Sequence, residues 1–281
     1  MSVFSGERGT AMRREAIILH GARVMGAIIS LAVVLVLAAA SFAQADTIKL
    51  RADLWCPYNC DPESDKPGLL IEVARAILTP AGHSIDYRTM PWSRALSEVR
   101  KGRIHGVIGA QQSEAPDLVY GRIPIAFDDT GFVVKQGVDF RYGGAASLDP
   151  YRIAVISDYN YDGGEIDAYL KENAAAKDRI QFNSGDDVGI ANLRKLIAGR
   201  VDVVIDSFTV MSYLIQKYNL SDKVYVVQLG RPTEIFIAFS PSDSRSNLWS
   251  ELLSAGIAPL RQRGELGVIL ARYGLKDWQK P

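Results

Sequence analysis

Hydrophobic positions follow two different rhythms along residues 46–281. Segments whose apolar residues recur every three or four positions are expected to be helices, and short runs of Val and Ile are expected to be buried strands. The expected helices cover residues 69–78, 93–101, 165–172, 188–198, 208–218, 244–263 and 265–273. The expected strands cover residues 47–55, 84–89, 127–135, 151–156, 180–182, 224–228 and 234–240, together with strands inside 102–110 and 199–207. Strands that alternate with helices predict an α/β protein with mainly parallel sheets.

Two stretches of the chain repeat one pattern. Gly102-Arg-Ile-His-Gly-Val-Ile-Gly-Ala110 is matched by Gly199-Arg-Val-Asp-Val-Val-Ile-Asp-Ser207, and each stretch follows an expected helix. The pattern is therefore a helix, a Gly that ends it, and a strand. Such junctions are common in α/β proteins, but the shared Gly-Arg favours two similar lobes. Open α/β sheets bind ligands at the carboxyl ends of their strands, so a ligand is expected between the lobes.

The long strand expected at residues 127–135 leaves the first lobe, and the strand at 234–240 returns to it. The predicted first lobe therefore contains residues 46–132 and 233–281, and the second lobe contains residues 133–232. Two connecting strands that lie side by side form a hinge, which allows the lobes to close around a ligand.

Residues 1–45 have the pattern of a secretory signal peptide. Four Arg precede an uncharged stretch at residues 24–45, which ends in Ala43-Gln-Ala45. A basic start, an apolar centre and small residues at the end predict cleavage before Asp46 and export to the periplasm. An uncleaved membrane anchor is the alternative, because ~20 apolar residues can span a bilayer.

Charge and cysteine content narrow the functional classes. The chain has 32 Lys and Arg and 32 Asp and Glu, without a basic run, so neither nucleic acid nor an anionic membrane is an expected partner. Cys56 and Cys60 are expected to form a disulfide in an oxidising compartment. The three His are dispersed in the sequence, so no metal or other cofactor is expected. The sequence contains no G-x-S-x-G, H-E-x-x-H or phosphate-loop motif.

Three further motifs are Pro91-Trp-Ser-Arg-Ala-Leu96, Leu196-Ile-Ala-Gly-Arg-Val-Asp-Val-Val204 and Ala258-Pro-Leu-Arg-Gln-Arg-Gly-Glu-Leu266. In their order and spacing, the chain resembles the periplasmic solute-binding proteins of ABC transporters, in particular the family that binds polar amino acids. The resemblance implies a two-lobe type II periplasmic-binding-protein fold, in which each lobe is a mainly parallel sheet flanked by helices and two hinge strands join the lobes. It also implies a monomer that delivers a small polar solute to an ABC transporter permease in the inner membrane.

Two departures from that family concern the ligand. Members that bind α-amino acids carry an Arg in the turn after the first repeated strand, where this chain reads Gln111-Gln-Ser-Glu-Ala-Pro-Asp117. They also place an Asp where this chain has Ser207, whereas Asp206 comes one residue early. A shift of one residue on a strand turns the side chain to the opposite face. We therefore expect a solute other than an α-amino acid, or an amino acid that is held differently.

The candidates for ligand contact lie at the ends of the expected strands. They are Trp55, Tyr58, Trp92, Gly109, Ala110, Gln111, Thr130, Asp158, Tyr159, Asp206 and Ser207. Aromatic rings can stack on a flat ligand or pack on a cation, although Trp55 is equally suited to capping the core. Asp206 is the first choice for a charged contact with an ammonium group, and capping of the next helix is its alternative role.

Two other features offer groups for an anion. The backbone N–H groups of Gly163 and Gly164 precede an expected helix and could receive an anion. Arg94 could replace the missing carboxylate clamp, although an exposed position on its helix is the more frequent outcome.

A binding protein without enzymatic activity is the favoured function. One alternative is a dehydratase of cyclic dicarboxylic acids on the same fold, which needs an acid–base group such as Asp158, Glu114 or Asp206. The other alternative is a membrane-anchored sensor that passes closure to a partner protein.

Overall fold

The computed structural model describes residues 45–185 and 187–278. The predicted signal peptide lies outside these residues. In the described part of the chain, every helix is too short or too polar to cross a membrane. Residues 46–281 form one compact unit, and the elements below belong to it.

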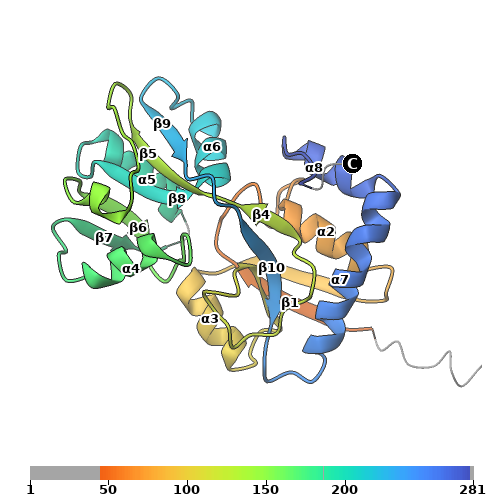
Figure 1. Ribbon diagram of the computed structural model, residues 1–281. Helices are drawn as coiled ribbons and strands as arrows, with labels where there is room; N and C mark the ends of the chain where they lie inside the picture. The colour runs from red at the N-terminus through yellow and green to blue at the C-terminus, as the bar shows by residue number, and fades with distance from the viewer. Residues whose placement is uncertain (1–44, 186, 279–281) are drawn as a thin grey trace, which may run out of the picture. The chain divides into compact units, whose positions relative to one another are not determined.

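Two five-stranded sheets organise this unit (Figure 1). The first sheet has the order β2-β1-β3-β10-β4 and contains β1 (Thr47–Ala52), β2 (Ser84–Thr89), β3 (Gly106–Ala110), β4 (Ala126–Asp128) and β10 (Thr233–Phe239). The second sheet has the order β7-β6-β8-β5-β9 and contains β5 (Thr130–Lys135), β6 (Ile153–Ile156), β7 (Ile180–Asn183), β8 (Val203–Ser207) and β9 (Val224–Gln228).

The two sheets have equivalent topologies. In each sheet the central strand of the first three pairs in parallel with both neighbours, β1 with β2 and β3, and β6 with β7 and β8. The repeated segments supply equivalent strands, β3 and β8, and each of these pairs with an antiparallel strand. The glycines before them, Gly102 and Gly199, have φ of 68° and 71°, a left-handed conformation that suits a glycine after a helix. The predicted two-lobe α/β fold with mainly parallel sheets is confirmed.

Helices cover the sheets. Those associated with the first sheet are α2 (Leu69–Leu78), α3 (Trp92–Arg100), α7 (Ser246–Gln262) and α8 (Glu265–Arg272). Those associated with the second sheet are α4 (Glu165–Glu172), α5 (Val188–Ile197) and α6 (Phe208–Lys217), and a short 3₁₀ helix, η1 (Ala145–Leu148), precedes β6. These boundaries agree closely with the predicted helices.

The strands of the second sheet are apolar on both faces because helices cover both faces. Phe132 and Ile205 pack in one cluster with Leu170 of α4, whereas Val133 packs in another cluster with Met211 of α6. Alternate residues of a strand point to opposite faces, so a strand with helices on both faces needs a continuous hydrophobic run. This is the pattern from which the strands were predicted.

The chain crosses from the first sheet to the second at Asp129 and returns through residues 229–232. The sequence predicted one strand at residues 127–135, but the structure has two, because β4 pairs with β10 and β5 pairs with β8 and β9. The Asp129 carboxylate accepts hydrogen bonds from Gln228 Nε2 and from the backbone N–H groups of Gly230 and Arg231. Asp129 therefore ties the two crossings together. The predicted lobe boundaries stay a prediction, although the crossings fall close to them.

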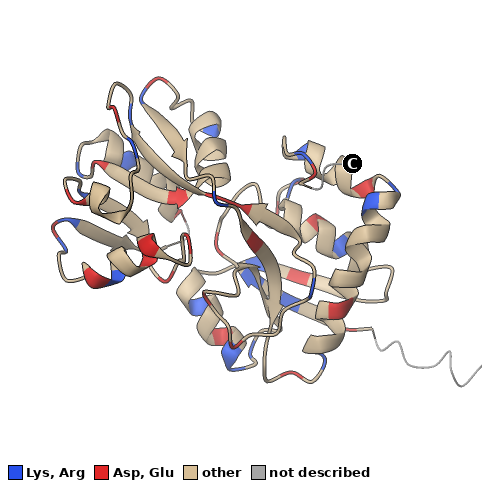
Figure 2. Ribbon diagram, in the orientation of Figure 1, with Lys and Arg blue, Asp and Glu red and all other residues tan. Residues whose placement is uncertain are grey.

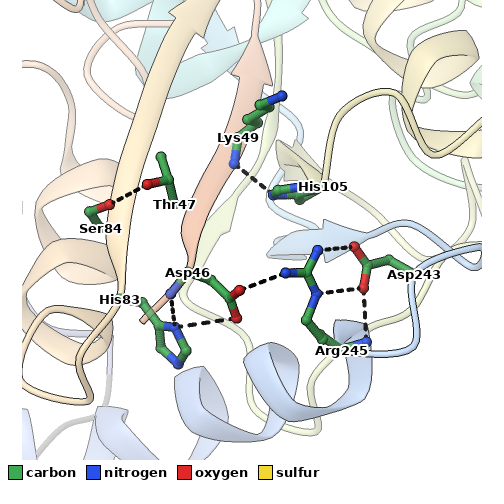
Figure 3. A network of polar contacts seen from close by, with 8 residues as sticks. All are labelled: Asp46, Thr47, Lys49, His83, Ser84, His105, Asp243 and Arg245. Carbon is green, nitrogen blue, oxygen red and sulfur yellow. Dashed lines mark hydrogen bonds and ion pairs between the residues drawn. The ribbon is translucent and has the colours of Figure 1, made fainter. Parts of the chain in front are cut away.

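A polar network closes the amino ends of the strands in the first sheet (Figure 3). Arg245, which precedes α7, donates to Asp46 at 2.6 Å and to the two oxygens of Asp243 at 3.0 and 2.8 Å. His83 Nδ1 lies 3.8 Å from the second oxygen of Asp46. These contacts attach the start of β1 to α7 and to the residue that precedes β2.

Candidate functional site

A cavity lies at the carboxyl ends of the strands, opposite the network of Figure 3, and residues of both sheets line it. Its lining consists of Asp53, Trp55, Trp92, Ile108, Gly109, Gln111, Glu114, Asp128, Thr130, Tyr159, Asn160, Tyr161, Asp206 and Ser207. The empty space between these residues, including its opening to solvent, is about 450 Å³, and water-sized molecules can be centred in about 30 Å³ of it. It occupies the position that the repeated strands predicted for a ligand.

Eight of the eleven predicted ligand-binding residues line this cavity. They are Trp55, Trp92, Gly109, Gln111, Thr130, Tyr159, Asp206 and Ser207. Their contact with a solute stays a prediction, but the structure brings them together from strand ends that are far apart in the sequence.

Tyr58, Ala110 and Asp158 are the three predicted residues that do not line it. Tyr58 is buried, and its hydroxyl donates to Phe127 O at 2.7 Å and to Asp128 Oδ1 at 3.1 Å. Ala110 is buried in the cluster that packs around α3. Asp158 is exposed and lines an outer groove, not the cavity itself. Arg94, the candidate clamp, is exposed on α3 and lies outside the lining.

The loop after β1 presents Trp55 to the cavity. The predicted disulfide joins Cys56 to Cys60, and Trp55 forms a β-bridge with Asn59 inside the same short loop. The Trp55 ring stacks on Tyr58, with ring centroids 4.5 Å apart. On its other side the ring approaches Gly109, where a Cβ atom would lie 3.3 Å from Trp55 Cε3. Gly109 also has a φ of 93°, so both the backbone and the close approach favour glycine there.

Two roles were predicted for Asp206, a charged contact with the solute and capping of the next helix. In the structure Ser207 caps that helix, and Asp206 lines the cavity. Ser207 caps α6, because its hydroxyl accepts a hydrogen bond from Val210 N at 3.0 Å and donates one to Asp128 Oδ1 at 2.7 Å. Asp206 does not cap the helix. Its Oδ1 accepts from the backbone N–H of Ser207 at 2.7 Å, and its Oδ2 is buried without a hydrogen-bond partner in the described structure.

Tyr159 and Asn160 connect the second sheet to the first across the cavity. The Tyr159 hydroxyl donates to Asp53 Oδ2 at 2.5 Å, and Asn160 Nδ2 donates to Ser113 Oγ at 3.0 Å. Tyr159 and Asn160 follow β6, whereas Asp53 follows β1 and Ser113 follows β3. The two lobes therefore touch on either side of the cavity.

The predicted anion site at Gly163 and Gly164 is wrong. Gly163 N donates to Asp167 Oδ2 at 2.8 Å and to Asn160 Oδ1 at 2.9 Å. Gly164 N donates to Asp162 Oδ1 at 2.8 Å. Acidic and amide side chains of the same loop thus occupy the backbone donors, which the sequence pattern of two glycines before a helix did not reveal.

Burial dominates the electrostatics of the cavity. Withdrawal from water raises the pKa of Glu114 from 4.5 to about 8, and raises the pKa of Asp206 from 3.8 to about 8. Burial also raises the pKa of Asp128 to about 7, although hydrogen bonds from Ser207 and Tyr58 act in the opposite direction. Each carboxyl group is held where its charged form is disfavoured.

Five cavity residues with polar side chains were not among the predicted contacts, namely Asp53, Glu114, Asp128, Asn160 and Tyr161. Asp53 and Asp128 end β1 and β4, so the strand-end criterion that selected Trp55 could have found them. Glu114 was named only as a candidate acid for an enzyme, and Asn160 was not named. Ordinary acidic loop residues carry no sequence signal of burial, which is why these residues were missed. Among the described residues, no group of three or more His, Cys, Asp or Glu is placed to hold a metal ion.

Known structures resemble this arrangement, whereas no protein-family model and no curated protein sequence matches the chain. A histidine kinase sensor domain with similarity to periplasmic binding proteins has a TM-score of 0.66 and 22% identity, over 82% of this chain and 98% of that chain. A structure from work on glutathione import via GshT and the cystine ABC importer of Streptococcus mutans has a TM-score of 0.67 and 16% identity, over 84% and 98% of the two chains. The chain has the type II periplasmic-binding-protein fold.

A third structure with the type II fold is the ancestral amino-acid-binding protein AncCDT-1, a precursor of cyclohexadienyl dehydratase. Its TM-score is 0.61 and its identity 13%, over 82% of this chain and 95% of that chain. Other matching structures are substrate-binding proteins of amino-acid ABC transporters. At these identities the likeness establishes the type II fold, and the solute has to be argued from the cavity of this chain.

Proposed function

We propose that the protein is a periplasmic solute-binding protein, which captures a small polar solute between its lobes and delivers it to an ABC transporter permease. The observation that carries this proposal is the cavity itself. It lies at the carboxyl ends of strands from both sheets, and both lobes contribute polar side chains to it. The matching amino-acid-binding proteins support the same class of function.

Closure of the lobes is the proposed mechanism. The bond between Tyr159 and Asp53 and the bond between Asn160 and Ser113 require the lobes to be together. A solute that touches both lobes makes all its contacts only in this closed form, so binding shifts the population toward it. A permease can then distinguish loaded from empty protein by shape. We propose that the protein acts as a monomer after removal of its signal peptide.

A dehydratase is the second candidate, because Glu114 and Asp206 are buried carboxyl groups that hold protons near neutral pH. No Lys, Arg or His is among the described residues of the lining, however, so a dicarboxylate substrate would have no cationic side chain to bind there. Incubation of the purified protein with prephenate or arogenate decides this point. Product formation would establish the enzyme, and its absence at high protein concentration favours the binding protein.

A ligand screen by thermal unfolding tests the proposed function. A true ligand at a hundredfold excess over its Kd adds ~2.7 kcal/mol to the free energy of unfolding, so it stands out from inert solutes. Small-angle scattering with that ligand should show a smaller radius of gyration than without it. An unchanged radius would contradict closure, and recovery of the protein in the membrane fraction would favour an anchored sensor.

A further inference from the structure

We propose that the captured solute is a small organic cation, such as an amine or a quaternary ammonium ion, which the carboxylates of Asp206 and Glu114 and the surrounding aromatic rings hold. This inference rests on the proposed function, because it names the class of solute that the same cavity takes. It narrows the small polar solute of the proposed function to a ligand that carries positive charge and no carboxylate.

The charge of the cavity is the first observation. Its titratable side chains, apart from tyrosines, are the carboxyl groups of Asp53, Glu114, Asp128 and Asp206. Among the described residues, no Lys, Arg or His lines the cavity. Elsewhere in the unit, Lys and Arg are interspersed with Asp and Glu along both sheets and their helices (Figure 2). The cavity therefore differs in charge from the mixed pattern around it.

Glu114 and Asp128 accept hydrogen bonds from neutral groups. Glu114 Oε1 accepts a hydrogen bond from Trp92 Nε1 at 2.6 Å, and Asp128 Oδ1 accepts from Ser207 and Tyr58. Such donors satisfy lone pairs but supply no positive charge. Coulomb attraction to a cation that enters this low-dielectric site is much stronger than it would be in water.

Asp206 shows most directly that a donor is missing. Only 1% of this residue is exposed, it lines the cavity, and its Oδ2 has no hydrogen-bond partner in the described structure. A buried polar atom without a partner is costly, and native structures rarely keep one without a reason. An ammonium or alkylammonium group in the cavity would donate to this oxygen and stabilise the ionised form of Asp206.

Aromatic rings complete a site for a cation. Trp55, Trp92 and Tyr159 line the cavity, and the rings of Trp92 and Tyr159 meet edge to face with centroids 6.3 Å apart. The faces of Trp and Tyr rings attract cations, most strongly when the cation is shielded from water. Rings favour alkylated ammonium groups over bare metal ions, because their surfaces also contact the carbon atoms.

A ligand carboxylate would find neutral donors in the cavity, such as Trp55 Nε1, which is buried without a partner, but no cationic side chain among the described lining residues. The turn after β3 contributes Gln111 and the carboxyl group of Glu114 to the cavity, and Arg94 is exposed elsewhere on α3. The backbone donors of Gly163 and Gly164 already bind Asp167 and Asp162. A carboxylate in the cavity would face carboxyl groups, so the arrangement selects against amino acids and organic acids.

A matched set of four-carbon solutes tests the proposal. Butylamine and putrescine are cations, γ-aminobutyrate is a zwitterion, butyrate is an anion, and tetramethylammonium is a cation without N–H groups. Thermal unfolding and calorimetry of the full chain, treated with a chelator, should show binding by at least one cation and none by butyrate. If amino acids or organic acids bind and the cations do not, this inference is overturned and the proposed function stands. If no solute of any charge class binds, both are overturned.

The Asp206→Asn variant locates the binding. Removing one partner of a buried charge pair should weaken binding of the best cation roughly 30-fold or more, while the shape of the side chain is kept. Asp243→Asn is the matched control, because Asp243 is a half-buried acid at the opposite end of the first sheet. It should leave the affinity within twofold of the parent protein. Equal affinities for the parent and Asp206→Asn would contradict the proposed site.

Discussion

At the amino ends of the strands in the first sheet, the half-buried acids Asp46 and Asp243 meet a cation. At the carboxyl ends, Glu114 accepts a hydrogen bond from a neutral donor, and Asp206 Oδ2 has no hydrogen-bond partner in the described structure. Asp46 and Asp243 share the guanidinium of Arg245 (Figure 3), and this pairing lowers the pKa of Asp243. Glu114 and Asp206 lie in the cavity, where burial raises their pKa to about 8. At the amino ends, where the acids have a structural role, the chain itself supplies the cation, Arg245. In the cavity, we propose, the cation comes from outside.

The largest expected effect is on how stability depends on pH. Glu114, Asp206 and Asp128 have pKa values in the folded protein of about 8, 8 and 7, above their ordinary values of 4.5, 3.8 and 3.8. The negative charge of Asp53 also raises the pKa of Glu114 and of Asp206, Asp158 adds to the effect on Glu114, and Asp128 adds to the effect on Asp206. The folded protein therefore binds more protons than the unfolded chain between about pH 4 and pH 8, so stability falls as the pH rises through this range. Each pKa unit corresponds to ~1.4 kcal/mol, and a total loss of a few kcal/mol is expected in chemical denaturation.

Asp243, which is paired with Arg245, serves as a control because its effect on the pH dependence of stability has the opposite sign. Asp243 has a lowered pKa, so its contribution is present above pH 3.8 and is lost as the pH falls through the lowered value. Glu114→Gln should flatten the decline between pH 4 and pH 8, and Asp243→Asn should not. An unfolding free energy of the parent that rises steadily from pH 5 to pH 8 would show that the cavity acids are not held as described.

The second effect concerns the contact between the lobes. Tyr159→Phe removes the hydroxyl that donates to Asp53 and keeps the ring in the cavity. A hydrogen bond to a carboxylate contributes ~1.5–3 kcal/mol, so the affinity for the solute should fall ~10-fold or more. Small-angle scattering should show a more open protein. The control is Tyr225→Phe on β9, which removes an exposed hydroxyl that donates to Val138 O. It should change neither the affinity for the solute nor the radius of gyration.

A smaller effect is expected at the paired end. Arg245→Met removes the cation from Asp46 and Asp243 and keeps an unbranched side chain of similar length near Trp249. Because the Arg245 side chain is 41% exposed, solvent screens its ion pairs, and a loss of only ~1 kcal/mol in the free energy of unfolding is expected. Solute affinity should not change. If Arg245→Met kept the stability of the parent protein but bound the solute weakly, the Arg245 network and the cavity would not act independently.

The smallest effect should come from Trp92→Phe. The hydrogen bond from Trp92 lowers the pKa of Glu114, so its removal should raise that pKa further. Cation affinity near neutral pH should then fall a few-fold, and the pH at which affinity levels off should move upward. In a Glu114→Gln background the same change should have no further effect on the pH profile. An identical shift in both backgrounds would mean that Trp92 acts through its ring alone.

Most helices and strands could be predicted from the sequence because their positions depend on local patterns of residues. Gly102 and Gly199 each end a helix before a strand, and a left-handed glycine at that position has a strong signature. The break at Asp129 was not predicted, although polar residues separate Phe127 from the apolar residues 132–134, because the change of sheet depends on which strands pair. Pairing is a tertiary property that the hydrophobic pattern leaves open.

The candidate site was predicted less completely. Strand ends identified Asp206, which lines the cavity and keeps its second oxygen without a hydrogen-bond partner in the described structure, while Ser207 caps the helix. Glu114 is an acid in a polar turn, a context that usually means exposure, and only the approach of Trp92 removes it from water. Tyr58 was expected in the cavity because it is aromatic and close to Trp55, but the Cys56–Cys60 loop directs it toward Asp128.

Proton release on binding tests the central claim most directly. Tetramethylammonium carries a fixed charge, so any proton released when it binds must come from the protein. Calorimetry near pH 7 in two buffers with different heats of ionisation measures that number. Because Glu114 and Asp206 hold protons at this pH in the solute-free protein, the account predicts release of about one proton or more for each bound ion. Binding with no proton release, or with proton uptake, would contradict the claim that buried acids of the cavity ionise to bind an organic cation.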